Sequence, residues 1–290
     1  MSFELHRPAT LEEAISLAAR LAPDARFIAG GTDLVIQMSR RRVSASHVIA
    51  LPQLPELQGV AETVDGYRIG AMTTYRTIER YPAFRGALEC LIEAARVVGG
   101  QQVRNIATVG SNIANASPAA DFVPALLCLD PTLEIVGPQG TRRVPLNELI
   151  RGPGATDMRA GEILAAAEFA RLPERSATAF LKEGRRKAME ISVVCVAASL
   201  TLDPHGTCTA VRIAIGAAAP RAFRLMEAEK ALLGKSAARE RFVEAGRLAA
   251  EAVSPISDVR ASAEHRRYLT SVMVERTLAT CHERILDTRR

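Results

Sequence analysis

Short apolar runs separated by polar turns recur along the first half of the chain, and their spacing predicts a mixed α/β region. The predicted β-type segments are residues 25–29, 47–51, a hairpin at 62–71 around Asp65-Gly66, and a hairpin formed by 133–136 and 142–144. The predicted helices are a first helix after the capping box Thr10–Glu13, a run at 34–38, a run at 77–98 that breaks near Pro82, and a buried helix at 119–129. Residues 162–169 fit a helix and a strand equally well.

The second half of the chain consists of strand patterns followed by helix patterns, which predicts an α+β domain. Three strands are expected at 177–182, 192–202 and 208–216, and helical runs at about 223–233, 237–253 and 263–286. The pattern changes around Leu172–Ser176, so we place a boundary there and predict two domains, 1–173 and 177–290. The length of 290 residues fits two domains of roughly 150 residues each.

Composition narrows the class of protein. Hydrophobic residues make up 48% and charged residues 24% of the chain, as in an ordinary soluble globular protein. The longest apolar stretch, near residues 193–200, is shorter than the ~20 residues that cross a bilayer, and the N-terminus lacks a secretory pattern. We therefore expect a cytoplasmic protein with no transmembrane segment. The net charge is only +5, and the basic runs at 40–42 and 185–187 contain no aromatic residues, so we expect no nucleic-acid partner.

The cysteines and histidines do not predict a metal or acid–base site. The five cysteines are scattered, without the short-spaced pairs that zinc or iron–sulfur ligation requires. Cys128 and Cys195 lie in apolar runs, which is typical of core residues in a reducing compartment. The histidines show no metal-ligand spacing, and no Gly-x-Ser-x-Gly elbow occurs. The sequence thus predicts no metal centre and no catalytic side chain, which fits a protein whose cofactor carries the redox chemistry.

Two small glycine- and asparagine-rich patches carry the strongest functional signal. The first is Ala29-Gly30-Gly31-Thr32-Asp33, set between a β-type run and a helix-type run, and the second spans Thr108–Asp121. Glycines let backbone amides approach a ligand and helix N-termini favour anions, so two such loops can hold a diphosphate from both sides. Neither patch is a Walker A loop or a Rossmann fingerprint, and a Gly-Gly pair after a strand is also a common turn.

Charge limits what the two aspartates of these patches can do. Asp33 would be repelled by a phosphate, so we expect it to cap the following helix or to fix the loop backbone. Asp121 has two open interpretations, either a cap for the helix at 119–129 or an acceptor for the hydroxyls of a sugar.

Six motifs together point to a known family. They are Arg7-Pro8, Ala29–Asp33, Ile69–Thr74, Gln102–Asn105, the Thr-x-Gly-x-Asn-x-x-x-Ala-x-Pro-x-x-Asp block at 108–121, and Gly161–Leu164. Through them most of the chain resembles the FAD-binding medium subunits of the molybdenum hydroxylases, the group that includes xanthine dehydrogenase and aerobic carbon monoxide dehydrogenase. The resemblance implies an FAD-binding fold of the vanillyl-alcohol oxidase-like type over 1–173, with two α/β subdomains. A smaller α+β domain, with a three-stranded sheet plus helices, would follow over 177–290.

The resemblance also implies a set of FAD contacts. The residues that would wrap the diphosphate are Ala29, Gly30, Gly31, Thr32 and Asp33, together with Gly110, Ser111 and Asn112. The remaining implied contacts are Thr108 on the flavin side, Asp121 toward the ribose of the adenosine half, Leu164 at the adenine end, and Lys182 from the domain boundary. One departure concerns Ser111, because the family usually has Gly-Gly-Asn there. A serine adds a side chain close to the phosphate, although its hydroxyl can donate a hydrogen bond.

The function that the resemblance implies is electron transfer within a complex. Substrate would be oxidised on a large molybdenum-cofactor subunit, and electrons would pass through a small iron–sulfur subunit to FAD on this chain and then to an external acceptor. A dimer of such heterotrimers is expected. The related hydroxybenzoyl-CoA reductases carry an additional cluster in this subunit, but the cysteine cluster that it needs is missing here. Two alternatives stay open, a self-contained flavin oxidase or dehydrogenase and a scaffold subunit without flavin.

Overall fold

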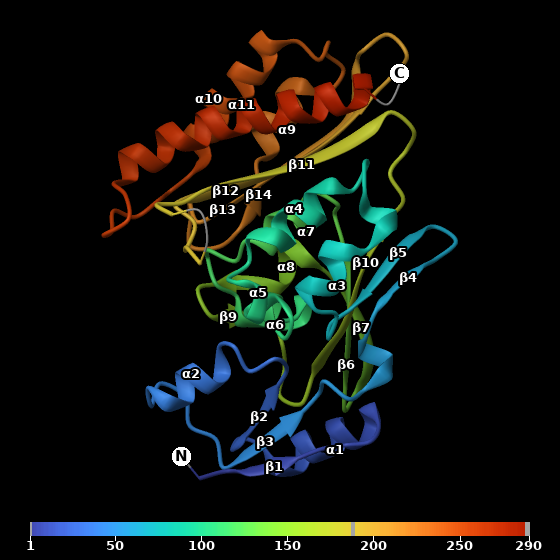
Figure 1. Cartoon of the computed structure of the whole chain (residues 1–290), viewed down its shortest axis with the longest axis vertical. Helices are drawn as coiled ribbons and strands as arrows, with labels where there is room; N and C mark the ends of the chain where they lie inside the picture. Colours follow the sequence, from blue (N-terminus) through green and yellow to red (C-terminus); the bar gives the residue numbers. More distant parts are fainter. Residues whose placement is uncertain (1, 187–188, 288–290) are drawn as a thin grey trace.

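The computed structural model describes residues 2–186 and 189–287 (Figure 1). At one end of the molecule lies a parallel sheet of three strands in the order β1-β3-β2. Its strands are β1 (Glu4–His6), β2 (Ala25–Ile28) and β3 (His47–Ala50), and its helices are α1 (Leu11–Leu21) and α2 (Leu34–Ser39). Only half of the predicted capping box is present, because Oγ1 of Thr10 accepts a hydrogen bond from the amide of Glu13, whereas the Glu13 carboxylate accepts from the amide of Ala9 and not from that of Thr10. Helix α1 packs on β2 and β3 and buries Ala14 and Ala18.

The middle of the molecule is built on an antiparallel sheet with the strand order β4-β5-β10-β6-β7. Its strands are β4 (Val60–Glu62), β5 (Gly66–Gly70), β6 (Thr132–Gly137), β7 (Gly140–Pro145) and β10 (Ile163–Ala170). The helices are α3 (Tyr75–Arg80), α4 (Glu89–Val97), α5 (Gln101–Arg104), α6 (Val109–Asn115), α7 (Phe122–Leu127) and α8 (Leu146–Leu149), and β8 (Ile150–Gly152) pairs with β9 (Ala155–Thr156). Both predicted hairpins, β4–β5 and β6–β7, are confirmed.

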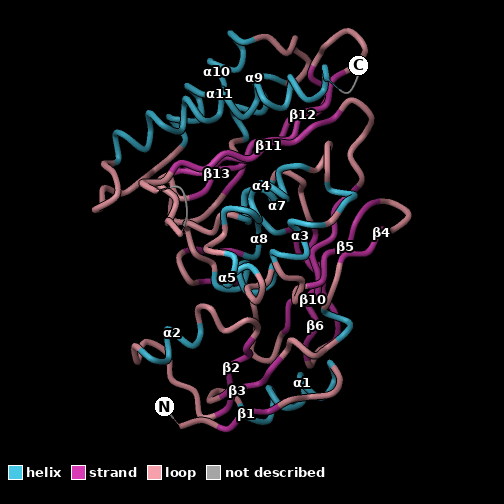
Figure 2. Tube along the Cα trace, viewed as in Figure 1, coloured by secondary structure: helices cyan, strands magenta, loops and turns pink. Residues whose placement is uncertain are grey.

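The C-terminal part is an antiparallel sheet covered by helices on its outer face (Figures 1 and 2). Its elements are β11 (Ser176–Glu183), β12 (Val194–Leu202), β13 (Cys208–Gly216), β14 (Phe223–Arg224), α9 (Met226–Leu232), α10 (Arg239–Ala252) and α11 (Ala263–Asp287). Helices α4 and α7 of the middle part pack on its other face. Along β12, Val194 and Val196 therefore belong to the C-terminal core, whereas Cys195 and Ala197 belong to the larger core. Burial on both faces explains why Val194–Ala198, the first part of this strand, is an unbroken apolar run.

Two details of the predicted elements need correction, and one choice that the sequence left open is settled. The run at 223–233 begins as the short strand β14, since Phe223 and Arg224 pair with β13, so the sheet has a fourth strand. Residues 162–169 form β10, whose pairing with both β5 and β6 settles a choice that the local sequence leaves open. The helix expected at 119–129 is shorter and spans Phe122–Leu127. The predicted boundary at Leu172–Ser176 falls at the link between β10 and β11.

The cysteines behave as expected for core residues. All five are free and buried, including Cys128 and Cys195. Burial raises the pKa of the Cys128 thiol well above its usual value, so this side chain acts as a small apolar group. Among the described residues, no helix combines the length and the apolar character that crossing a bilayer requires.

Candidate cofactor-binding site

A cavity of about 270 Å³ opens between the N-terminal sheet and the middle part of the molecule. Three segments that are distant in the sequence form its walls: the end of β2 with its following loop, helix α6, and the start of β10. Seven of the sequence-predicted residues line it, namely Ala29, Gly31, Thr32, Asp33, Gly110, Ser111 and Leu164. Gly30 adjoins it through the loop. The two patches predicted to act together therefore do face one space.

The loop after β2 needs its glycines for two different reasons. A Cβ atom on Gly30 would lie 1.9 Å from the carbonyl oxygen of Ile106, so only glycine allows the two loops to touch. Gly31 has a φ of +72°, a left-handed conformation that glycine adopts without steric cost. Within the described part of the chain, the backbone amides from Gly30 to Asp33 donate no hydrogen bond. Because backbone amides are normally paired, this row of free donors at the cavity is suited to an anionic ligand.

Helix α6 forms the opposite wall, and its first amides are already in use. The amide of Gly110 donates to the carbonyl of Ala71 at 2.7 Å, and the amide of Ser111 donates to Oγ1 of Thr108 at 3.3 Å. A Cβ atom on Gly110 would lie 2.5 Å from Cβ of Ala71. Gly110 thus lets α6 pack closely on the end of β5, while the free amides lie on the other loop.

Thr108 and Asn112 belong to α6 without lining the cavity. Thr108 is buried and caps the helix, with Ser111 completing a capping box. Oδ1 of Asn112 is buried and has no hydrogen-bond partner among the described residues. Such an acceptor is normally satisfied by a ligand or a water molecule, so Oδ1 of Asn112 is able to accept a hydrogen bond from a ligand.

Ser111 uses its hydroxyl within the protein. Its Oγ donates to the carbonyl oxygen of Thr108 at 2.9 Å, and it accepts a hydrogen bond from Oγ1 of Thr108 at 3.0 Å. The serine that departs from the family pattern is therefore explained by helix capping, and its proton is not free for a phosphate.

We expect the Ser111→Ala variant to keep its cofactor and to lose about 1 kcal/mol or less of stability. The stability loss follows from removing one half of a capping box. Alanine is no larger than serine, so the cavity keeps its room for the cofactor. Flavin content per chain and a urea unfolding curve measure the two effects separately. Loss of cofactor from a folded Ser111→Ala protein would contradict this interpretation.

Neither aspartate caps its helix in the way the sequence suggested. Asp33 occupies the N-cap position of α2 and Asp121 that of α7, but neither side chain makes a capping hydrogen bond. Asp33 keeps solvent contact, and partial desolvation raises the pKa of its carboxyl group. Its backbone carbonyl accepts from the amide of Gln37, so Asp33 contributes to the start of α2 through its backbone.

Asp121 and Lys182 form a buried ion pair away from the cavity lining. Nζ of Lys182 donates to Oδ2 of Asp121 at 2.6 Å, and these side chains are only 11% and 10% exposed. The Ser192 hydroxyl donates to the other carboxylate oxygen. Desolvation raises the pKa of Asp121, although Lys182 and Ser192 oppose this shift. The pair links the start of α7 to β11, so it joins the middle and C-terminal parts.

Sequence reasoning missed several residues of the site. Nε2 of Gln37 on α2 donates to Oδ1 of Asn115 on α6 at 3.3 Å, which ties the two walls together. Glu162 also lines the cavity, and Arg142 holds it through two hydrogen bonds of 2.7 and 2.8 Å. The hydrogen bonds from Arg142 lower the pKa of Glu162 and keep it ionised. Asn115 lies within the second patch, but nothing in the sequence marks Gln37 as its partner.

Two family models match the chain. One is described as the FAD binding domain in molybdopterin dehydrogenase and matches residues 1–170. The other is described as the CO dehydrogenase flavoprotein C-terminal domain and matches residues 179–281. Together they cover both the part that holds the cavity and the C-terminal sheet with its helices.

Individual relatives are similar over nearly their whole length. The xanthine dehydrogenase FAD-binding subunit of Escherichia coli O157:H7 is 36% identical over 276 residues, which cover 94% of each chain. The carbon monoxide dehydrogenase medium chain of Afipia carboxidovorans is 30% identical and covers 96% of each chain. A crystal structure of the Cu,Mo-CO dehydrogenase in its cyanide-inactivated form contains a chain that superposes with a TM-score of 0.94 at 30% identity, covering 98% of this chain and 99% of that one.

Proposed function

The chain belongs to the family of FAD-binding medium subunits of the molybdenum hydroxylases, and from this premise we propose that it transfers electrons within a larger complex. The family, the fold and the FAD cofactor expected from the motifs are confirmed. The chain is accordingly a subunit of an oxidoreductase. What we propose beyond this is the route of the electrons, the partner subunits and the individual FAD contacts.

The observation that carries the proposal is the row of free amides at the cavity. In the proposal, the amides from Gly30 to Asp33 bind the FAD diphosphate, and Gly110 leaves room for it on α6. Leu164 lies at the adenine end on β10, where it contributes an apolar surface. When bound, FAD supplies the redox chemistry, and the side chains of this protein bind and orient it.

The other predicted contacts lie outside the cavity lining. Thr108, Asn112, Asp121 and Lys182 complete the proposed set and would meet the parts of the cofactor that extend past the cavity. Asn112 supports this assignment through its unpartnered oxygen. Because Asp121 and Lys182 bind each other, we propose that they meet the cofactor as a pair, which also fixes the position of α7 against β11.

The proposed partners are a large molybdenum-cofactor subunit and a small iron–sulfur subunit, assembled as a dimer of heterotrimers. The relatives are named as subunits and medium chains of such enzymes. Within the described residues, no cysteine belongs to a cluster of potential metal ligands, so the proposal places the iron–sulfur clusters on a partner. The free cysteines favour a reducing compartment, and the proposal includes a cytoplasmic location.

The test compares the co-expressed complex with and without its flavin. We expect heat release of FAD from the complex, and reduction of the acceptor that falls steeply once flavin is removed and returns when FAD is added. The substrates named for the relatives, such as xanthine, carbon monoxide and nicotinate, form the first panel. Undiminished acceptor reduction by the flavin-free complex would overturn the proposed route. Rapid flavin reduction by a small substrate in the isolated chain would instead favour a self-contained dehydrogenase.

A further inference from the structure

Strand pairing gathers two histidines and a glutamate on one face of the N-terminal sheet. Strands β1 and β3 are parallel, and Glu4 lies opposite His47 in their register. Glu4 and His6 are two positions apart on β1, so both side chains project from the same face. The two histidines are 41 residues apart in the chain, which is why sequence spacing did not predict a metal site.

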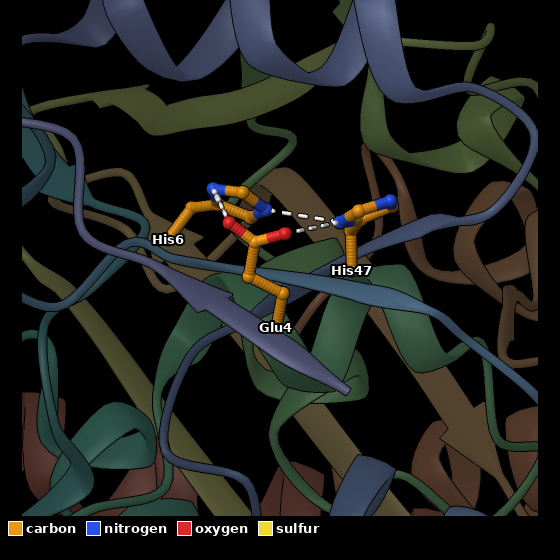
Figure 3. A group of neighbouring side chains, drawn as sticks. All are labelled: Glu4, His6 and His47. Carbon is orange, nitrogen blue, oxygen red and sulfur yellow. Dashed lines mark hydrogen bonds and ion pairs between the residues drawn. The ribbon is translucent and has the colours of Figure 1, made fainter. Parts of the chain in front are cut away.

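Figure 3 shows the Glu4 carboxylate between the two imidazole rings. Nε2 of His6 lies 3.1 Å from Nδ1 of His47. The carboxylate oxygens of Glu4 lie 3.5 Å from Nδ1 of His47 and 3.8 Å from Nδ1 of His6. The potential ligand atoms of the three residues all lie within 4.8 Å of one another. The side chains of His6 and His47 are only 16% and 26% exposed, whereas Glu4 is open to solvent.

We propose that Glu4, His6 and His47 bind a divalent transition-metal ion, with Zn²⁺ as the reference ion. In a tetrahedral zinc site with metal–ligand distances of about 2.0–2.1 Å, neighbouring ligand atoms lie roughly 3.3 Å apart. The distances from Nδ1 of His47 to Nε2 of His6 and to the nearer oxygen of Glu4, 3.1 and 3.5 Å, bracket that value. Zn²⁺, Cu²⁺ and Ni²⁺ accept imidazole nitrogen, whereas Mg²⁺ and Ca²⁺ prefer oxygen ligands, so this donor set selects the former ions.

Without the metal, the two rings share one proton in a hydrogen bond. The metal ion takes the place of that proton between the nitrogen atoms, the donor ring carries its proton on its other nitrogen so that both rings bind as neutral ligands, and the Glu4 carboxylate balances part of the metal charge. Three protein ligands leave the fourth position of a tetrahedral ion to water, which the exposure of Glu4 permits.

The proposed ion links a short edge strand to its neighbour. β1 has only three residues and, among the described strands, pairs with β3 alone, so a metal bridge between their side chains directly stabilises its attachment to the sheet. On the other side of β3 lies β2, which leads into the loop from Ala29 to Asp33. The site therefore stabilises the sheet that supports one wall of the cavity, and it does so whether or not the proposed electron route is correct.

The test is a calorimetric titration of Zn²⁺ into the full-length chain, purified without a histidine tag and stripped with a chelator. We expect one Zn²⁺ per chain. The His47→Ala and Glu4→Gln variants should lose at least about tenfold in affinity, since even groups that only orient a metal ligand are worth that much. Glu4→Gln keeps its size at an exposed position, so it is expected to fold normally.

His205→Ala is the matched control, because His205 is an exposed histidine in the turn between β12 and β13 and belongs to no such cluster within the described part of the chain. It should bind Zn²⁺ as the unaltered chain does. Zn²⁺ should also raise the melting temperature of the unaltered chain and of His205→Ala more than that of His47→Ala, since binding to the folded state stabilises it. Absence of stoichiometric binding, or equal affinity in all four proteins, would overturn the proposal and leave the cluster as a hydrogen-bonded group only.

Discussion

Replacing Gly30 with alanine is expected to lower the affinity for FAD by about tenfold or more, so that the purified complex retains less of it. The new Cβ atom would lie 1.9 Å from the carbonyl oxygen and 2.5 Å from the carbonyl carbon of Ile106. Both are backbone atoms, so no side chain can rotate away and the loop itself must shift. Overpacking of this kind costs about 1–3 kcal/mol of stability, and it separates the free amides from the α6 wall. A loss of 1.4 kcal/mol in binding is already about tenfold in affinity. The measurement is FAD released per chain from the purified complex.

Gly152→Ala is the matched control for this substitution. Gly152 ends the short strand β8, a Cβ atom there would meet no atom within 4 Å, and its φ is not positive. The control should keep its full flavin content. If Gly30→Ala retained FAD as well as Gly152→Ala does, the contact between the two loops would not be what shapes the cofactor site.

The parts of the fold and of the site that could be predicted are those that depend on residues close together in the sequence. A Gly-Gly pair between a strand and a helix predicts that the backbone comes close to another group. In the structure Gly30 lies against the backbone of Ile106, at a distance that only glycine permits. The amphipathic spacing of the C-terminal helix predicted residues 263–286, and the observed α11 spans Ala263–Asp287. In both cases the signal lies within a few residues of the feature that it predicts.

What could not be predicted depends on pairing across long distances. The alanine-rich run of β10 suits a helix as well as a strand, and only its neighbours β5 and β6 decide between them. Asp121 meets Lys182, 61 residues later, because α7 packs on the C-terminal sheet. His6 and His47 meet through the register of two parallel strands. Local propensity contains none of this information, whereas family resemblance indicates which residues gather but not which of them pair.

The buried pair of Asp121 and Lys182 leads to the second large expected effect. Replacing Lys182 with methionine leaves a carboxylate that is only 10% exposed without its cation. Breaking a buried pair in this way costs about 3–5 kcal/mol, because the remaining charge keeps its desolvation penalty. Urea unfolding of the variant and of the unaltered chain measures the difference. Lys230→Met is the control, because it removes a lysine from an exposed pair with Glu227 and should leave stability unchanged within error.

The pH dependence of Lys182→Met distinguishes a lost charge from a lost contact. Desolvation already raises the pKa of Asp121, and removing Lys182 removes an interaction that lowers it, so the pKa rises further. A carboxyl group whose pKa is higher in the folded than in the unfolded state binds its proton more tightly when folded. The contribution of this group to stability is therefore fully present below its unfolded-state pKa and is lost as the pH rises through its folded-state pKa. The double variant Asp121→Asn, Lys182→Met has no such charge, so its stability should show no such fall and should exceed that of Lys182→Met at neutral pH. If both variants had the same stability and the same pH dependence, the defect would come from packing at β11 and not from the unpaired carboxylate.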